Sequence, residues 1–62
     1  MWSFVRTAWI EPFAGRWTAL VTLARDGAEE SFWLHFDTEP TLDEADAAGA
    51  ALAAAKNEEP AP

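Results

Sequence analysis

Apolar and polar residues alternate along two runs on either side of Asp26-Gly27, a dipeptide typical of tight β-turns. This pattern predicts a β-hairpin over residues 17–37. With a two-residue turn the pairing follows by counting outward, and one face of the hairpin carries the pairs Val21–Phe32, Ala19–Leu34 and Trp17–Phe36. The other face carries the pairs Ala24–Glu29, Thr22–Ser31, Leu20–Trp33 and Thr18–His35. The first face is the more apolar of the two, so we predict that it faces the core.

Residues 2–10 are rich in Phe, Val, Thr and Trp, which predicts a first strand. A four-residue loop at 12–15 would set Glu11 opposite Arg16 and Ala8 opposite Ala19. The core face would then receive Phe4, Ala8, Ile10 and also Arg6, whose long side chain can reach the sheet edge. The outer face would receive Val5, Thr7 and Trp9. A bulge at Gly15 is the alternative, and it would exchange the two faces of this strand.

The segment Thr41-Leu42-Asp43-Glu44 has the pattern of a capping box and predicts a helix that begins at Leu42. The helix is expected to run to about Lys56, with Asn57 as its stop. At 100° per residue, the side directed at the sheet carries Leu42, Ala45, Ala48, Gly49 and Leu52. Such small residues let a helix lie close to a sheet, and Gly49 indicates the close approach of an aromatic ring.

These elements predict an α+β fold in which a three-stranded antiparallel β-meander packs on one C-terminal α-helix (βββα). One domain is expected over residues 1–57, followed by a loose acidic and proline-containing tail at 58–62. The 62 residues include no cysteine, so four Trp and four Phe must supply most of the apolar burial. No run approaches the roughly 20 apolar residues of a membrane span, and residues 1–4 do not resemble a signal peptide. We therefore expect a soluble, cytoplasmic protein.

The formal net charge of −7 is concentrated in the C-terminal part of the chain. Residues 1–36 carry three arginines against four acidic residues, whereas residues 37–62 carry one lysine against seven. This distribution disfavours direct binding to nucleic acid or to an anionic membrane and favours a basic protein surface. Solubility alone is the alternative explanation. The predicted acidic surface comprises Asp43, Glu44, Asp46, Glu58 and Glu59.

Residues with catalytic chemistry are scarce in this sequence. His35 is the one histidine, and Ser3 and Ser31 lie in no nucleophile motif. Asp43, Glu44 and Asp46 would be a candidate cluster for a divalent ion, but helix capping and the helix dipole already account for all three. The sequence therefore predicts no catalytic residue, no metal site and no cofactor.

The outer face of the predicted sheet is the candidate binding surface. It presents an aromatic and aliphatic patch made of Trp9, Leu20, Trp33 and His35. A large exposed apolar patch on a small protein is typical of an interface, and tryptophan is enriched among the residues that dominate binding. The alternatives are that the first strand has the opposite phase, or that Met1-Trp2 folds over this face.

The chain also resembles the AP2-type DNA-binding fold, which occurs in the arm-binding domains of some phage integrases. The resemblance rests on the segments 12–17 (PFAGRW) and 33–38 (WLHFDT), on Ala19 and Val21, and on the alanine-rich helix. It implies a three-stranded antiparallel sheet packed on one helix. That family reads DNA with Arg, Lys and Trp on the outer sheet face, whereas the predicted outer face here offers no clear cation. Loop lengths also differ, with one extra residue before Gly15 and about three more before the helix.

Together these features favour a non-enzymatic, acidic protein-binding module. It would dock on a protein with a basic surface or self-associate through the sheet face. One specific form is an inhibitor that occupies a nucleic-acid-binding surface of its partner, as small anti-restriction and anti-CRISPR proteins of phages do. The alternatives are a structural or accessory subunit of a larger assembly, such as a virion or a toxin-antitoxin complex, and an AP2-like DNA-binding domain.

Overall fold

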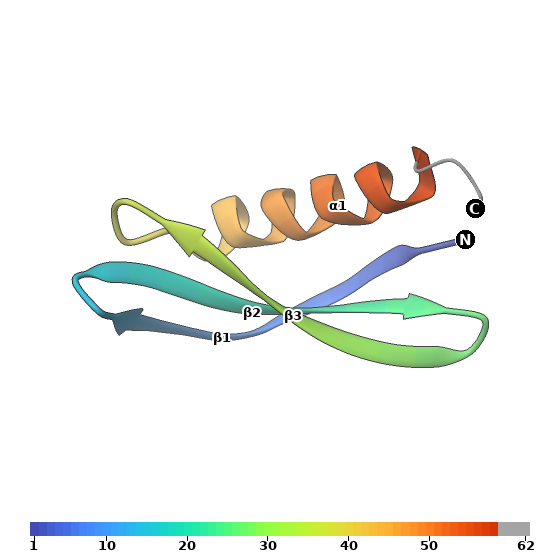
Figure 1. Ribbon diagram of the computed structural model, residues 1–62, viewed down its shortest axis with the longest axis horizontal. Coiled ribbons are helices and arrows are strands. Elements are labelled where there is room, and N and C mark those ends of the chain that lie inside the picture. Colours follow the sequence, from blue (N-terminus) through green and yellow to red (C-terminus); the bar gives the residue numbers. More distant parts are fainter. Residues whose placement is uncertain (59–62) are drawn as a thin grey trace.

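A computed structural model describes residues 1–58 as an antiparallel sheet with one helix lying across one of its faces (Figure 1). The sheet has the order β1-β2-β3, with β1 at Ser3–Phe13, β2 at Arg16–Arg25 and β3 at Ala28–Phe36. The helix α1 spans Leu42–Glu58. The predicted α+β arrangement of three antiparallel strands followed by one C-terminal helix is therefore confirmed.

The β2–β3 hairpin has the predicted register along its whole length. Val21 pairs with Phe32, Leu20 with Trp33, and every other predicted pair is present. Asp26 and Gly27 form the turn with φ angles of +53° and +82°. Positive φ at both central residues is what a two-residue turn needs to match the twist of its strands, and Asp-Gly adopts it readily.

The β1–β2 hairpin differs from the predicted one at its turn. The expected four-residue loop is wrong, because Ala14 and Gly15 alone form the turn, with φ angles of +53° and +78°. Phe13 therefore pairs with Arg16. Pro12 lies within β1, which is an edge strand, and an edge strand tolerates a proline because its missing N–H can face away from the ladder.

Two β-bulges interrupt β1, between Phe4 and Arg6 and between Thr7 and Trp9. Each bulge inserts one extra residue, which moves the side chains before it to the opposite face of the sheet. Two bulges cancel each other, so only the residues between them change face. Trp9 therefore keeps its predicted outer face, and Phe4 and Ile10, which pair with Leu23 and Ala19, keep the core face.

For the residues between the two bulges, the predicted assignment of side chains to the two faces of the sheet is wrong. Arg6 lies on the outer face, where it forms an ion pair of 3.2 Å with Glu29, and Thr7 lies on the helix side. Ala8, expected in the core, is exposed. The bulges thus keep the arginine out of the core.

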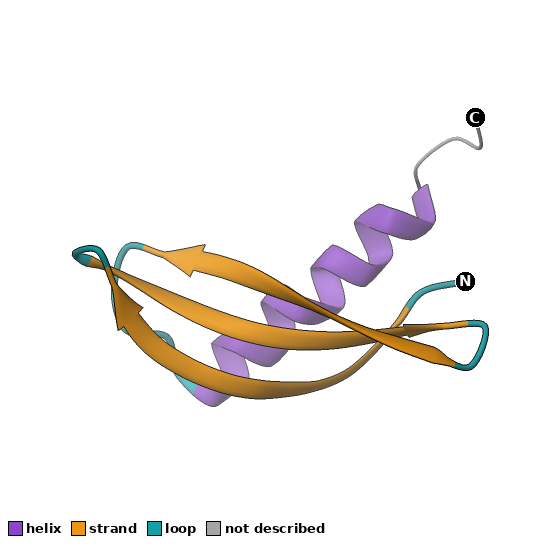
Figure 2. Ribbon diagram, turned by 60° about the horizontal axis from the view of Figure 1, so that its bottom comes forward, coloured by secondary structure: helices purple, strands orange, loops and turns teal. Residues whose placement is uncertain are grey.

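The helix rests on the sheet through its smallest side chains. Ala45, Gly49 and Ala53 are its buried residues, and α1 runs obliquely over β1 and β2 (Figure 2). A methyl group added at Gly49 would lie 2.5 Å from Cε1 of Phe4, which confirms the predicted approach of a ring. Leu42, predicted to face inward, is 59% exposed; it is the first residue of α1 and precedes the first buried one, Ala45.

The predicted capping box is confirmed at the start of α1. The backbone N–H of Glu44 donates to Oγ1 of Thr41 over 3.1 Å, and the N–H of Thr41 donates to the carboxylate of Glu44 over 2.9 Å. At the other end, α1 extends through Asn57, the predicted stop, to Glu58, which was expected in the tail. Residues 59–62 lie outside the described part of the chain.

The central strand β2 is buried on both faces. Ala19, Val21 and Leu23 are fully buried under the helix. On the outer face Thr18 and Thr22 are buried by the flanking strands. Their hydroxyl groups are satisfied, since Oγ1 of Thr18 donates to the carbonyl of Glu11 over 3.0 Å and Oγ1 of Thr22 lies 3.1 Å from Oγ of Ser31.

Two sets of polar contacts attach the N-terminal part of the chain to the helix. The hydroxyl of Thr7 donates to Oδ1 of Asp46 over 2.6 Å. The side-chain amide of Asn57 pairs with the backbone of Trp2, accepting from its N–H over 2.6 Å and donating to its carbonyl over 2.8 Å. Asp46, predicted as part of an acidic surface, is therefore half-buried between helix and sheet.

Replacing Thr7 with valine is expected to lower the free energy of unfolding by about 1–2 kcal/mol, because the half-buried carboxylate of Asp46 loses its donor. Urea denaturation of the two proteins measures the difference. Thr38→Val, at an exposed position, is the matched control and should change stability by less than about 0.5 kcal/mol. Equal effects of the two substitutions would show that the Thr7–Asp46 contact contributes nothing.

Candidate functional site

The sheet face opposite α1 carries the residues that the sequence predicted as a binding patch. The pairing places Trp9, Leu20 and Trp33 in one row across the three strands. The next row consists of Glu11, Thr18 and His35. All four predicted residues, Trp9, Leu20, Trp33 and His35, thus lie in two adjacent rows on one face.

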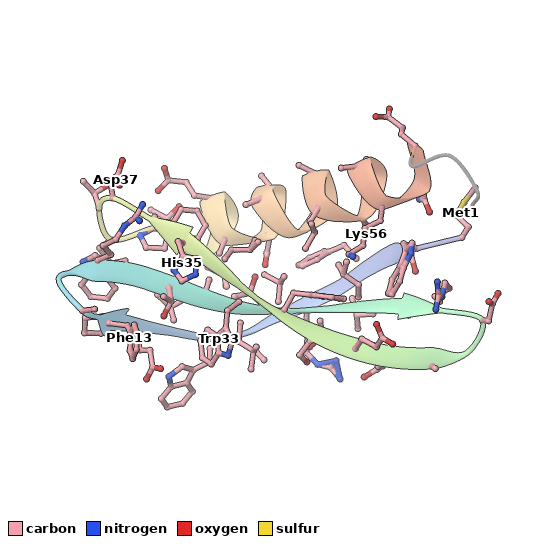
Figure 3. The ribbon with its side chains drawn as sticks, in the orientation of Figure 1. Met1, Phe13, Trp33, His35, Asp37 and Lys56 are labelled. Carbon is pink, nitrogen blue, oxygen red and sulfur yellow. The ribbon has the colours of Figure 1, made fainter. Side chains whose placement is uncertain are left out.

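This face exposes large aromatic side chains. Trp9 is 59% exposed, Trp33 is 49% exposed and Phe13, two residues beyond Glu11 on the same face of β1, is 64% exposed. Phe13 and Trp33 point away from the helix (Figure 3). We define the outer patch as this aromatic surface together with its neighbours: Trp9, Glu11, Phe13, Leu20, Trp33 and His35.

Trp2 does not cover the outer patch. Its ring lies edge-on to Phe32, with 5.8 Å between centroids, and Phe32 belongs to the helix side of the sheet. Nζ of Lys56 lies 4.5 Å from the centroid of Phe32, and the guanidinium carbon of Arg25 lies 4.5 Å from the centroid of Trp2. These contacts hold Trp2 on the opposite face, so the alternative in which Met1-Trp2 shields the patch is wrong.

A groove of about 310 Å³ opens within the outer patch. Its lining comprises Glu11, Phe13, Thr18, Trp33 and His35. Sequence reasoning missed Glu11 and Phe13, because the expected loop removed Phe13 from the strand. The sequence does contain a sign of this arrangement. Residues 9, 11 and 13 alternate along the chain, so their side chains share one face of the sheet if the strand extends to Phe13.

The carboxylate of Glu11 has a fixed position in this groove. Its Oε2 atom accepts a hydrogen bond of 3.0 Å from Nε1 of Trp9. The backbone carbonyl of Glu11 accepts from the buried hydroxyl of Thr18, which anchors the same residue from below. The groove therefore combines one oriented carboxylate with aromatic walls, and no lysine or arginine is among its lining residues.

The predicted acidic surface is not one surface. Asp43 and Glu44 lie in the first turn of α1 and Glu58 ends it, a separation of about 20 Å at 1.5 Å per residue. Asp46 contacts Thr7, and Glu59 lies outside the described residues. The exposed helix surface between the two ends is alanine: Ala47, Ala50, Ala51, Ala54 and Ala55.

In residues 1–58, no group of three or more His, Cys, Asp or Glu side chains is placed to hold a metal ion. Within the same range, no helix has the length and apolar character that crossing a bilayer requires.

The arginines of the outer face bear on the resemblance to DNA-binding proteins. The structure places Arg6 and Arg16 on this face, but each is paired with a carboxylate, Arg6 with Glu29 and Arg16 with Asp37 at 3.0 Å. Such pairs leave little positive charge for phosphates. The AP2-type resemblance stays a prediction from the residue pattern. The chain matches no known protein family, no curated protein and no solved structure.

Proposed function

We propose that this chain is a non-enzymatic protein-binding module that contacts its partner through the outer patch. The observation that carries the proposal is the exposure of Trp9, Phe13 and Trp33 on the face that the helix leaves open. Tryptophan side chains with about half of their surface in water contribute less to folding than buried ones do. They contribute strongly to binding when a partner buries them.

The charge of the chain supports a partner with a basic surface. A net charge of −7 steers association toward positive surfaces and opposes the close packing of two copies of the chain. We therefore favour a different protein over self-association. An inhibitor that occupies the basic nucleic-acid-binding surface of its partner is the narrower form of this proposal, and an accessory subunit of a larger assembly would use the same patch.

The double variant Trp9→Ala/Trp33→Ala is expected to lose its partner while it keeps its fold. Each tryptophan at the centre of an interface is worth on the order of 2 kcal/mol or more, so the affinity should fall by at least ~100-fold. Quantitative capture from an extract of the native host, with immobilised wild-type and variant proteins, identifies the partner, and titration calorimetry then measures the loss. Circular dichroism checks the fold.

Leu42→Ala is the matched control, because Leu42 is exposed to a similar degree but lies at the start of the helix. It should retain the partner. A partner that the double variant captures as well as the wild type does would refute the role of the outer patch. Titration at increasing ionic strength tests the narrower form, since an inhibitor held by charge should weaken steeply with salt.

A further inference from the structure

We propose that the groove in the outer patch receives the guanidinium group of an arginine side chain of the partner protein. The cation would pack between Phe13 and Trp33 and donate hydrogen bonds to the carboxylate of Glu11, which is its counter-charge. This inference rests on the proposed function and specifies which chemical group anchors the partner.

The shape of the groove suits one inserted side chain. Glu11 on β1 and His35 on β3 lie on either side of Thr18, and two strand spacings separate them, about 10 Å. Thr18 is small and buried, so the floor of the groove is low. Phe13 lies on β1 and Trp33 on β3, in the rows on either side of the row of Glu11, Thr18 and His35. Their rings therefore form two diagonally opposite sides of the groove.

The chemistry of the groove favours a cation. Oε2 of Glu11 is occupied by the indole of Trp9, and Oε1 accepts no hydrogen bond from residues 1–58, so one carboxylate oxygen is available to a new donor. Aromatic faces attract cations through their quadrupoles. A guanidinium group is planar, stacks on rings and is weakly hydrated, so it suits a half-open aromatic groove better than an ammonium group does.

The cations of the chain itself do not fill this groove. The sequence has four lysines and arginines in total. Arg6 and Arg16 pair with carboxylates, and Arg25 and Lys56 lie over the rings of Trp2 and Phe32 on the other side of the sheet. Among residues 1–58, no lysine or arginine forms an ion pair with Glu11, so its carboxylate is free to pair with a cation of another molecule. The contact of Arg25 with Trp2 shows the same packing, guanidinium over indole, within the protein.

The test is an NMR titration of the full chain with a short peptide in which one arginine is the only charged group. The expected result is saturable shifts of the indole N–H signals of Trp9 and Trp33. A peptide of the same sequence with citrulline, the neutral isostere of arginine, should leave these signals unchanged. Glu11→Gln should weaken binding about 10-fold or more, as expected for one hydrogen bond between charged groups. Glutamine can still accept from Trp9, so the groove keeps its shape.

Glu29→Gln is the control variant, because it removes a carboxylate from the same face outside the groove and should bind the arginine peptide as the wild type does. Equal responses to the arginine and citrulline peptides, or unchanged binding by Glu11→Gln, would overturn the inference. If the arginine peptide fails to bind while Trp9→Ala/Trp33→Ala still loses the partner, the groove assignment alone is wrong. If the double variant keeps the partner, the outer patch is not the interface.

Discussion

Gly49→Val is expected to lower the free energy of unfolding by about 3 kcal/mol or more, although valine has a higher helix propensity than glycine. An added Cβ would lie 2.5 and 2.6 Å from two ring carbons of Phe4 and 3.3 Å from Cβ of Val21. The ring is held between α1 and β2, so the helix must move away from the sheet or the ring must leave its place. A gain of a few tenths of a kcal/mol in propensity cannot offset that displacement.

Ala50→Val is the matched control for this substitution, because it puts the same side chain on the next residue of the helix, at an exposed position. It should cost no more than about 0.7 kcal/mol. Urea denaturation measures both variants. In a double-mutant cycle, Gly49→Val should cost less in a Phe4→Ala background than in the wild type, since the ring that clashes is then absent. Equal stability of Gly49→Val and Ala50→Val would mean that the helix does not approach Phe4 as described.

Leu23→Ala is expected to cost about 2–5 kcal/mol, the range for deleting a fully buried leucine side chain. Leu23 is completely inaccessible to solvent and lies on the central strand opposite Phe4. A domain of this size has a total stability of about 3–9 kcal/mol, so the variant should lose a large part of it and unfold at a much lower temperature than the wild type. Thermal unfolding followed by circular dichroism measures the loss.

Leu42→Ala provides the comparison, because the same atoms are removed from a residue that is 59% exposed. Its effect on stability should stay within about 0.5 kcal/mol. The comparison also tests the seating of the helix. Leu42 lies on the same side of α1 as Gly49, since seven residues make almost two turns, so a large loss would mean that the first turn of the helix packs against the sheet.

The elements that the sequence predicted correctly are those whose determinants are local. Asp26-Gly27 specifies its turn by the backbone angles that these two residues tolerate, and the register of β2 and β3 follows by counting. Thr41 and Glu44 likewise specify the start of the helix through reciprocal hydrogen bonds. Such features need no knowledge of distant parts of the chain.

The errors concern features that depend on tertiary contacts. The turn at Ala14-Gly15 requires positive φ at an alanine, which the cross-strand pairing around it must offset at a cost of about 1–2 kcal/mol. The bulges in β1 are visible only once Thr7 is seen to contact Asp46 and Arg6 to contact Glu29. No local pattern marks either position.

The candidate site was predicted in its aromatic part and missed in its charged part. Trp33 lies in a hairpin without bulges, and the error in the β1–β2 turn amounts to two residues, an even number that leaves Trp9 on the predicted outer face. Glu11 and Phe13 were missed because their place depends on how far β1 continues toward the turn. With a turn of two residues in place of four, β1 continues to Phe13. The strand then adds Phe13 and Glu11 to the aromatic patch, which becomes a groove with a carboxylate.

The bulges in β1 also bear on which changes of chain length the fold can absorb. β1 holds two more residues between Phe4 and Trp9 than its partner strand holds opposite them. A deletion of Val5 or of Ala8 would leave every remaining pair intact and straighten the strand. β2 has no spare residue against β3, so a deletion there would turn half of its buried side chains outward. Length variants of this protein should therefore be tolerated in the first strand and lost in the second.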